Sequence, residues 1–154
     1  MVDTSKLPEE ERRHLVAKEL APFTTAPFVN GPPLNKRRIA IITTAGLHRI
    51  DDERFNLVDL TYRVLPSDVR TEDLTMTHSS VHFDRIGFRE DVNLVFPIDR
   101  LKEMAEQGEI ESVARYHYSF MGAGWPPERI EQTAKQLAEL LKEDGVDGVV
   151  LSPV

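Results

Sequence analysis

Arg38-Ile39-Ala40-Ile41-Ile42-Thr43-Thr44 is the stretch that decides the fold of this chain. Its apolar, mostly β-branched side chains occupy consecutive positions, which is typical of a strand covered on both faces. Such a strand belongs in the middle of a parallel sheet with helices above and below it. Ala45-Gly46 follows and marks the end of the strand. The sequence therefore predicts an α/β fold built around this strand.

Predicted strands and helices alternate after this point. Three further strands are expected, at residues 74–77, 112–118 and 146–151. Helices are expected from Pro97 to Gly108 and from Pro126 to Gly145, because proline favours a helix start and glycine a helix end. Residues 49–73 are predicted to be irregular, with a turn at Pro66-Ser67-Asp68. This order favours βα crossovers, and we expect a three-layer, open, mostly parallel sheet with helices on both faces.

Residues 1–36 are predicted to form a helix and an extended arm that precede a single α/β domain at residues 37–154. A helix is expected over residues 8–20, because Pro8 opens it and acidic side chains fill its first turn. Residues 21–36 contain four prolines and Gly31, which favour an extended arm over a packed element.

Composition and charge exclude several classes of protein. The 154 residues are 40% hydrophobic and 29% charged, which is typical of one soluble globular domain. A net charge of −7 without a basic stripe argues against nucleic-acid binding. No apolar stretch resembles a secretory signal or is long enough to span a bilayer, so we expect a cytoplasmic protein. The absence of cysteine excludes disulfides, thiolate metal sites and a thiol nucleophile within these residues.

Polar and titratable residues follow three of the predicted strands. The nine candidate site residues are Thr43, Thr44, Gly46, His48, His78, His82, Asp84, His117 and Gly122. In an open α/β sheet, ligands bind in the crevice outside the carboxyl ends of the strands. Histidine has an unperturbed pKa of about 6.5 and can exchange protons at cellular pH. We therefore expect substrate binding and acid–base chemistry at this edge of the sheet.

Each of these features also has a purely structural explanation. The hydroxyls of Thr43 and Thr44 suit capping of the following turn as well as they suit ligand contact. His78 and His82 would share a face and could bind a metal only if the segment between them were helical, and no His-Glu-x-x-His pattern is present. We therefore expect no metal site.

Several stretches of the sequence, in this order, resemble one known family. They are Thr43-Thr44-Ala45-Gly46-Leu47-His48, residues 62–68, His78-Ser79-Ser80-Val81-His82-Phe83-Asp84-Arg85, residues 91–101 and His117-Tyr118-Ser119-Phe120-Met121-Gly122. Together they resemble the selenoprotein B component of the glycine, sarcosine and betaine reductases and its shorter D-proline reductase relative. The resemblance covers residues 38–154, and the segment before it carries none.

The resemblance implies an oxidoreductase of amino-acid metabolism. In the family, a selenocysteine, or a cysteine in its place, attacks the carbon α to the carboxylate of glycine, betaine, sarcosine or D-proline and cleaves a C–N bond. Dithiols or a partner selenoprotein recycle the site. A companion subunit with a pyruvoyl group holds amine substrates in several members, so the resemblance implies such a partner and no cofactor in this chain. A homo-oligomer is compatible with it.

The redox residue of the family opens a short motif (selenocysteine or cysteine, two residues, then cysteine) directly after a strand that resembles residues 145–154. We therefore expect the nucleophile just after Val154, and we hypothesise that an in-frame UGA codon truncates the chain there. The predicted last strand reads as buried on both faces, yet no helix follows to cover it.

Roles follow for the candidate residues if the chain belongs to such a reductase. We predict that His78 or His82 protonates the leaving amine or activates the nucleophile, and that Asp84 orients a histidine. Substrate binding is predicted for the other six candidates: Thr43, Thr44, Gly46, His48, His117 and Gly122.

Two alternatives remain open. The first is a complete, cysteine-free relative that acts as a binding or regulatory subunit or as a His/Asp-based hydrolase or lyase. The second is an inactive truncated product that associates through its last strand.

Overall fold

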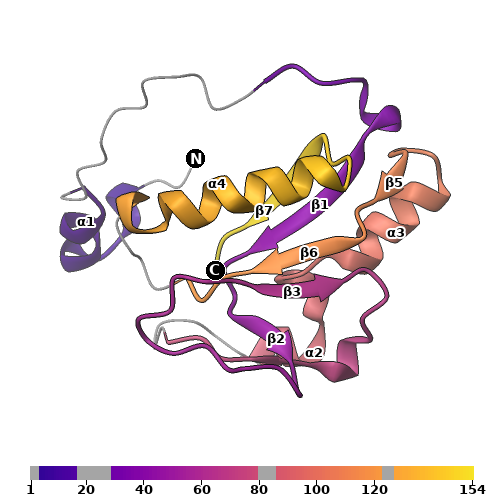
Figure 1. Cartoon of the computed structure of the whole chain (residues 1–154). Coiled ribbons are helices and arrows are strands. Elements are labelled where there is room, and N and C mark those ends of the chain that lie inside the picture. The colour runs from indigo at the N-terminus through magenta and orange to yellow at the C-terminus, as the bar shows by residue number, and fades with distance from the viewer. Residues whose placement is uncertain (1–3, 17–28, 80–85, 123–126) are drawn as a thin grey trace. The chain divides into compact units, whose positions relative to one another are not determined.

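The computed structural model describes residues 4–16, 29–79, 86–122 and 127–154 (Figure 1). It contains two compact units, Met1–Asn30 and Gly31–Val154. The first unit holds a short 3-10 helix, Thr4–Lys6, and helix α1, Glu9–Val16. Three glutamates occupy the first turn of α1, where the positive end of the helix dipole stabilises them. Pro8 directly precedes the helix, and residues 17–20 of the helix predicted over 8–20 lie outside the described residues.

The main sheet of the second unit is built around β1, Arg38–Thr43 (Figure 1). Strand β7, Gly148–Ser152, pairs with one edge of β1, and β5, Ser112–Val113, and β6, Tyr116–Ser119, pair in succession with the other. All three pairings are parallel, which confirms the predicted open, mostly parallel α/β sheet with β1 at its centre. Strand β3, Arg63–Pro66, is antiparallel to β6. The prediction that residues 49–73 are irregular was therefore wrong at β3.

A second, smaller sheet lies beside the carboxyl end of β1. It pairs β2, Leu47–Arg49, with β4, Leu74–Met76, in antiparallel register. The strand predicted at 74–77 is present, but it does not extend the main sheet. Gly46, with φ of +68°, turns the chain out of β1, so the residues after it start a new sheet.

Helices cover both faces of the main sheet, as predicted. Neighbouring residues of a strand point to opposite faces, and Ile41 packs in the main core whereas Ile42 faces a cavity lined by α4, Pro127–Glu143. Helix α3, Ile98–Glu106, contributes Ile98 and Leu101 to that core. The short elements are α2, Ile86–Glu90, and the 3-10 turns Leu34–Lys36, Thr71–Asp73 and Val92–Leu94. Within the described ranges, no helix has the length and apolar character needed to cross a membrane.

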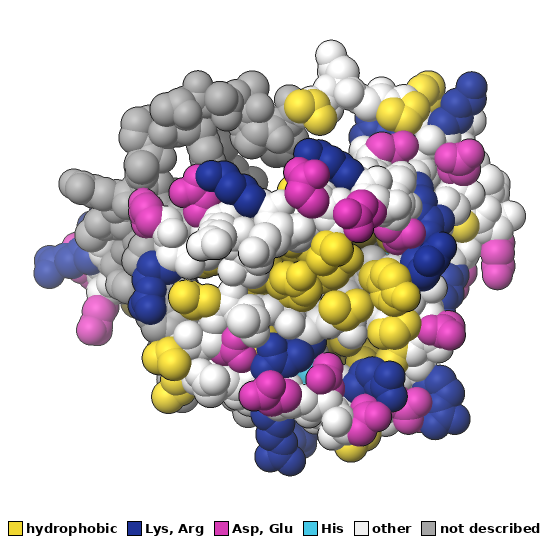
Figure 2. Space-filling model, viewed as in Figure 1, with side chains coloured by type: hydrophobic (Ala, Val, Ile, Leu, Met, Phe, Trp, Pro, Cys, Tyr) yellow, Lys and Arg dark blue, Asp and Glu magenta, His cyan; other side chains and the backbone are white. Residues whose placement is uncertain are grey.

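Strand β7 is exposed on the α4 face, so the prediction that it is buried on both faces was wrong. The side chains of Val149 and Leu151 are 41% and 70% exposed. The physical reason is the width of the sheet. β7, β1, β6 and β3 lie side by side about 4.8 Å apart, and together they are wider than one helix of about 10 Å diameter. Figure 2 shows other hydrophobic side chains gathered below α4. By strand register, Val64 in β3 and Tyr116 in β6 lie on the same face of the sheet as Ile42, and both are exposed.

The apolar edge strand predicts self-association that a charge should suppress. β7 contains no charged residue, and among the described residues it pairs only with β1. Since uncharged edges invite strand pairing, we expect the sedimentation coefficient of the wild-type chain to rise with concentration and that of Leu151→Lys to rise less. Leu140→Lys, on α4, is the matched control and should behave like the wild type. Equal concentration dependence of the wild type and Leu151→Lys would contradict the prediction.

Candidate functional site

The carboxyl ends of β1, β6 and β7 meet at one edge of the sheet, because these strands run in the same direction. Backbone hydrogen bonds join the residues that leave the strands there. Phe120 N–H donates to the Thr43 carbonyl at 2.9 Å, and Thr44 N–H donates to the Ser152 carbonyl at 3.1 Å. Hydrogen bonds therefore connect the strand ends at the edge where the sequence predicted a ligand-binding crevice.

A cavity of about 550 Å³ opens beside this edge, between the sheet and α4. Its lining is mostly apolar and includes Ile42, Thr44, Phe120, Gly122, Leu137 and Leu141. Asp59 is also among the residues that line it. We call this the α4 cavity. Of the predicted substrate-binding residues, it brings Thr44 and Gly122 together.

A second cavity, of about 510 Å³, contains His78. Thr77, His78 and Ser79 line it together with residues 55–58 and Met121. Met121 also lines the α4 cavity, and its sulfur accepts a hydrogen bond from the Ser79 hydroxyl at 3.1 Å. We call this the His78 cavity. The structure therefore places His78 in a different cavity from Thr44 and Gly122, with Met121 between the two.

Gly46 ties the strand ends together through its backbone. Its N–H donates to the Phe120 carbonyl at 2.8 Å, and its carbonyl accepts from the Thr77 N–H at 2.9 Å. A Cβ at this position would lie 2.4 Å from the Thr77 carbonyl oxygen. Gly46 thus joins the loop after β6 to the segment that carries His78.

Alanine at position 46 is expected to destabilise the fold strongly. Gly46→Ala adds a methyl group to a contact of 2.4 Å and also strains a φ of +68°. Gly108→Ala is the matched control, since Gly108 has a φ of +72° and nothing within 4 Å of the added methyl. We expect Gly46→Ala to lower the free energy of unfolding by about 1–3 kcal/mol more than Gly108→Ala does, measured by urea denaturation. Equal losses would show that the backbone shifts to accept the methyl.

Three of the predicted substrate-binding side chains are fully buried and line neither cavity. The Thr43 hydroxyl accepts a hydrogen bond from Ala45 N–H at 3.2 Å. The His48 Nδ1–H donates to its neighbour's carbonyl, that of Arg49, at 2.7 Å, and His48 Nε2 accepts from the Thr77 hydroxyl at 2.8 Å. His117 is the third. Apart from His117 Nε2, the side-chain polar atoms of these residues bond to the chain itself, which favours the capping alternative for Thr43.

His117 fills a gap in the β1 ladder. The ladder is interrupted between β5 and β6, and Ile41 N–H donates to His117 Nδ1 at 2.9 Å. The neutral ring therefore carries its proton on Nε2, which has no hydrogen-bond partner among the described residues. Burial lowers the pKa of His117 to about 4; the Asp144 charge opposes this shift, and Lys102 and Arg38 add to it. His117 is accordingly neutral at physiological pH.

His82 and Asp84 lie outside the described residues, so their predicted catalytic roles remain predictions. Within the described ranges, no three acidic or histidine side chains are grouped so that they could hold a metal ion.

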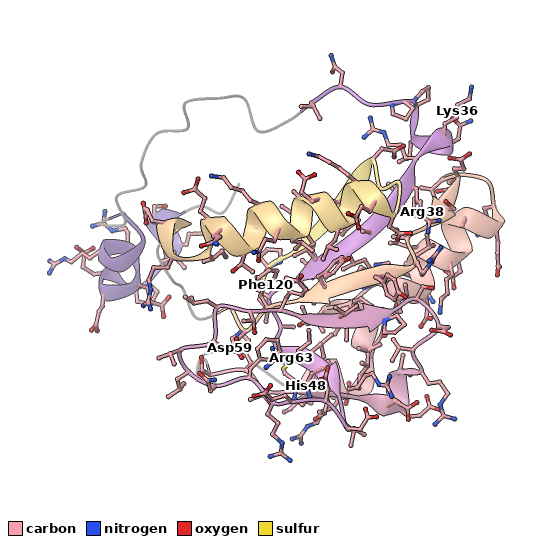
Figure 3. The ribbon with its side chains drawn as sticks, viewed as in Figure 1. Lys36, Arg38, His48, Asp59, Arg63 and Phe120 are labelled. Carbon is pink, nitrogen blue, oxygen red and sulfur yellow. The ribbon has the colours of Figure 1, made fainter. Side chains whose placement is uncertain are left out.

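A buried ion pair that the sequence analysis missed holds the walls of both cavities. Arg63 and Asp59 lie side by side in Figure 3, with Nη2 to Oδ2 at 2.9 Å and side chains only 10% and 7% exposed. Arg63 also donates to the Glu53 carbonyl at 2.7 Å and stacks 4.3 Å above the Phe55 ring. Burial raises the pKa of Asp59, but hydrogen bonds from Thr61 and Arg63 outweigh it and lower that pKa overall. In the sequence, the only indication of this ion pair was a single arginine beside apolar residues.

Comparison with known proteins places this chain in a family. The family model described as glycine/sarcosine/betaine reductase selenoprotein B matches residues 22–154. The D-proline reductase subunit gamma of Acetoanaerobium sticklandii is 36% identical over 121 residues, which are 77% of this chain and 49% of that subunit. No solved structure matches.

Relatives from other reductase complexes are similar over the same share of the chain. The betaine reductase complex component B subunit beta of Peptoclostridium acidaminophilum is 30% identical over 123 residues, 77% of this chain and 28% of the relative. The glycine reductase complex component B subunit gamma of the same organism is 30% identical over 125 residues, with the same coverage. The chain thus spans half or less of each relative's length. These matches confirm the resemblance found in the sequence: this chain belongs to the glycine/sarcosine/betaine reductase selenoprotein B family.

Proposed function

We propose that this chain forms the substrate-pocket part of a reductase subunit that cleaves a C–N bond α to a carboxylate. The substrate is of the glycine, betaine, sarcosine or D-proline type, as in the names of the relatives. The nucleophile, a selenocysteine or cysteine, directly follows Val154 in the complete subunit. A companion subunit, which carries a pyruvoyl group where the substrate is an amine, completes the site.

One observation carries this proposal. The Val154 N–H donates to the Thr44 hydroxyl at 2.9 Å, and Thr44 lines the α4 cavity. A residue that follows Val154 therefore begins at the wall of a cavity that lies at the carboxyl edge of the sheet. This is the edge at which open α/β sheets bind their ligands. The position suits a nucleophile that must reach a small bound substrate.

The proposed chemistry moves two electrons. The selenolate or thiolate forms a bond to the carbon α to the carboxylate, and the electron pair of the C–N bond leaves with the nitrogen, which a histidine protonates. A thiol of a dithiol then attacks the selenium or sulfur. The α carbon keeps the electron pair of the broken bond and takes a proton. The second thiol attacks the first sulfur and displaces the selenolate or thiolate, so the dithiol ends as a disulfide, the nucleophile is regenerated and the substrate is reduced.

Turnover by the complete subunit tests the proposal. The subunit is assembled with its companion subunits, supplied with dithiothreitol and offered D-proline, betaine, sarcosine and glycine separately. We expect a linear amino acid from D-proline, because cleavage opens its ring, or a free amine and acetate from the other three. The 154-residue chain, which contains no cysteine, is the control and should consume none of them. Consumption of none of the four by the complete assembly, above the rate with dithiothreitol alone, would refute the proposal.

His82 is the proposed proton donor to the leaving nitrogen. We expect His82→Ala in the complete subunit to lower kcat by about 10²-fold, which is typical for loss of a general acid. His14→Ala, in the N-terminal unit, is the matched control and should leave kcat unchanged. Wild-type turnover by His82→Ala would remove His82 from the mechanism and leave His78 as the candidate.

A further inference from the structure

The Thr44 side chain replaces a backbone carbonyl at the end of the β1–β7 ladder. The regular pairing stops at Thr43 and Ser152, and Thr44 N–H still donates to the Ser152 carbonyl at 3.1 Å. The next bond of a regular parallel ladder would run from Val154 N–H to the Thr44 carbonyl oxygen. Val154 N–H instead donates to the Thr44 hydroxyl, at 2.9 Å. Through this hydroxyl, β1 stays hydrogen-bonded to the other strand two residues beyond the regular pairing, as far as Val154.

The Thr44 backbone is held from its other side by the loop after β6. A Cβ at Gly122 would lie 2.4 Å from the Thr44 carbonyl oxygen and 2.9 Å from Thr44 Cβ. Only glycine fits so close, and its φ of +67° is one that glycine adopts without strain. Thr44 therefore sits between the β6 loop, which packs on its backbone, and Val154, which bonds to its hydroxyl.

The Thr44 hydroxyl contacts both backbone polar groups of Val154. A threonine hydroxyl has one O–H to donate, and that of Thr44 lies 3.4 Å from a backbone oxygen of Val154, which is long for an O–H donor. A substrate carboxylate can only accept hydrogen bonds. Binding it through this hydroxyl would replace the 3.4 Å contact, whereas the 2.9 Å bond from the Val154 N–H uses a lone pair of the hydroxyl oxygen and does not need that proton. The short bond from the Val154 N–H gives the Thr44 side chain a structural task, beside the substrate contact that the sequence predicts.

We infer that Thr44 is a positioning residue that fixes Val154, and with it the nucleophile proposed to follow, at the wall of the α4 cavity. The catalytic part of this inference rests on the proposed function. A nucleophile displaced by about 1 Å can cost about 10²-fold in rate, whereas ground-state binding of the substrate changes less. Loss of the hydroxyl should therefore lower kcat and leave KM nearly unchanged.

The test compares Thr44→Val with Thr44→Ser in the complete, assembled subunit. Valine keeps the shape of threonine without the hydroxyl, and serine keeps the hydroxyl. Hydrogen exchange of the Val154 amide reports the bond, and steady-state turnover reports its consequence. Thr75→Val, in β4, controls for the loss of a threonine hydroxyl as such.

We expect Thr44→Val to speed exchange of the Val154 amide and to lower kcat by about 10–10²-fold with KM within about threefold of the wild type. Thr44→Ser should keep both the exchange rate of the Val154 amide and kcat close to those of the wild type.

Two results would overturn the inference. One is a Val154 amide that exchanges in Thr44→Val as slowly as in the wild type. The other is a raised KM at unchanged kcat, which indicates direct substrate binding by Thr44. If instead the wild type turns over none of the substrates, the proposed function fails, and the exchange data still decide whether the Thr44 hydroxyl holds Val154.

Discussion

Arg63→Met is expected to lower the free energy of unfolding by about 3–5 kcal/mol, because it leaves the buried Asp59 carboxylate without its charge partner. The Arg63 guanidinium also satisfies backbone carbonyls of the segment before β3, with donors 2.7 Å from the Glu53 oxygen and 3.3 Å from the Arg54 oxygen. Methionine fills a similar volume but donates no hydrogen bond, so these groups stay buried without partners. Urea denaturation at neutral pH, followed by circular dichroism, measures the loss.

A matched control separates burial from charge pairing as such. Arg49→Met breaks a pair with Asp51 of the same 2.9 Å length, but those side chains are 47% and 71% exposed. Pairs of this kind contribute about 1 kcal/mol or less. Arg63→Lys keeps the charge but has fewer donors, and should fall between the two. A loss for Arg63→Met no larger than that for Arg49→Met would mean that water reaches Asp59 when the guanidinium is removed.

Helices α3 and α4 and the central strand could be predicted because local chemistry fixes their ends, whereas the short α2 was not predicted. β1 is an apolar, β-branched run, α3 begins after Pro97, and α4 begins at Pro127. β3 could not be predicted in this way. Its inward-facing Arg63 looks like a surface residue until the fold brings Asp59 and the carbonyls of residues 53 and 54 around it. Tertiary contacts therefore decide this strand.

The sequence predicted which edge of the sheet holds the candidate site, but not which side chains contact one another there. Parallel strands end together, so residues after β1 and β6 had to lie near one another, and Thr44 and Gly122 line one cavity. Because successive side chains of a strand point to opposite faces of the sheet, some residues next to these two point away from the cavity. His48 and His117 carry the same side-chain chemistry as His78 but are used to bond the backbone or a neighbouring threonine. Residue type alone does not distinguish these uses.

His117 is expected to make the folded state acid-sensitive between pH 6.5 and pH 4. Its pKa is about 4 in the folded protein against 6.5 for the free side chain. Between these values the unfolded chain binds a proton that the folded chain does not, so stability falls as the pH falls through this window. The full difference corresponds to about 3 kcal/mol. Below pH 4 both states are protonated and this contribution stays constant.

His117→Asn isolates this effect from the other titrating groups. The asparagine side-chain oxygen can accept the Ile41 N–H in place of Nδ1, but the side chain does not titrate. Denaturation of both proteins at a series of pH values should give curves that diverge below pH 6.5, with the wild type losing about 3 kcal/mol more than the variant by pH 4. The remaining histidines and the carboxylates titrate in both proteins and cancel. Parallel curves would mean that the His117 ring reaches solvent or a proton acceptor when it is charged. In that case burial of the ring would not be what keeps it neutral.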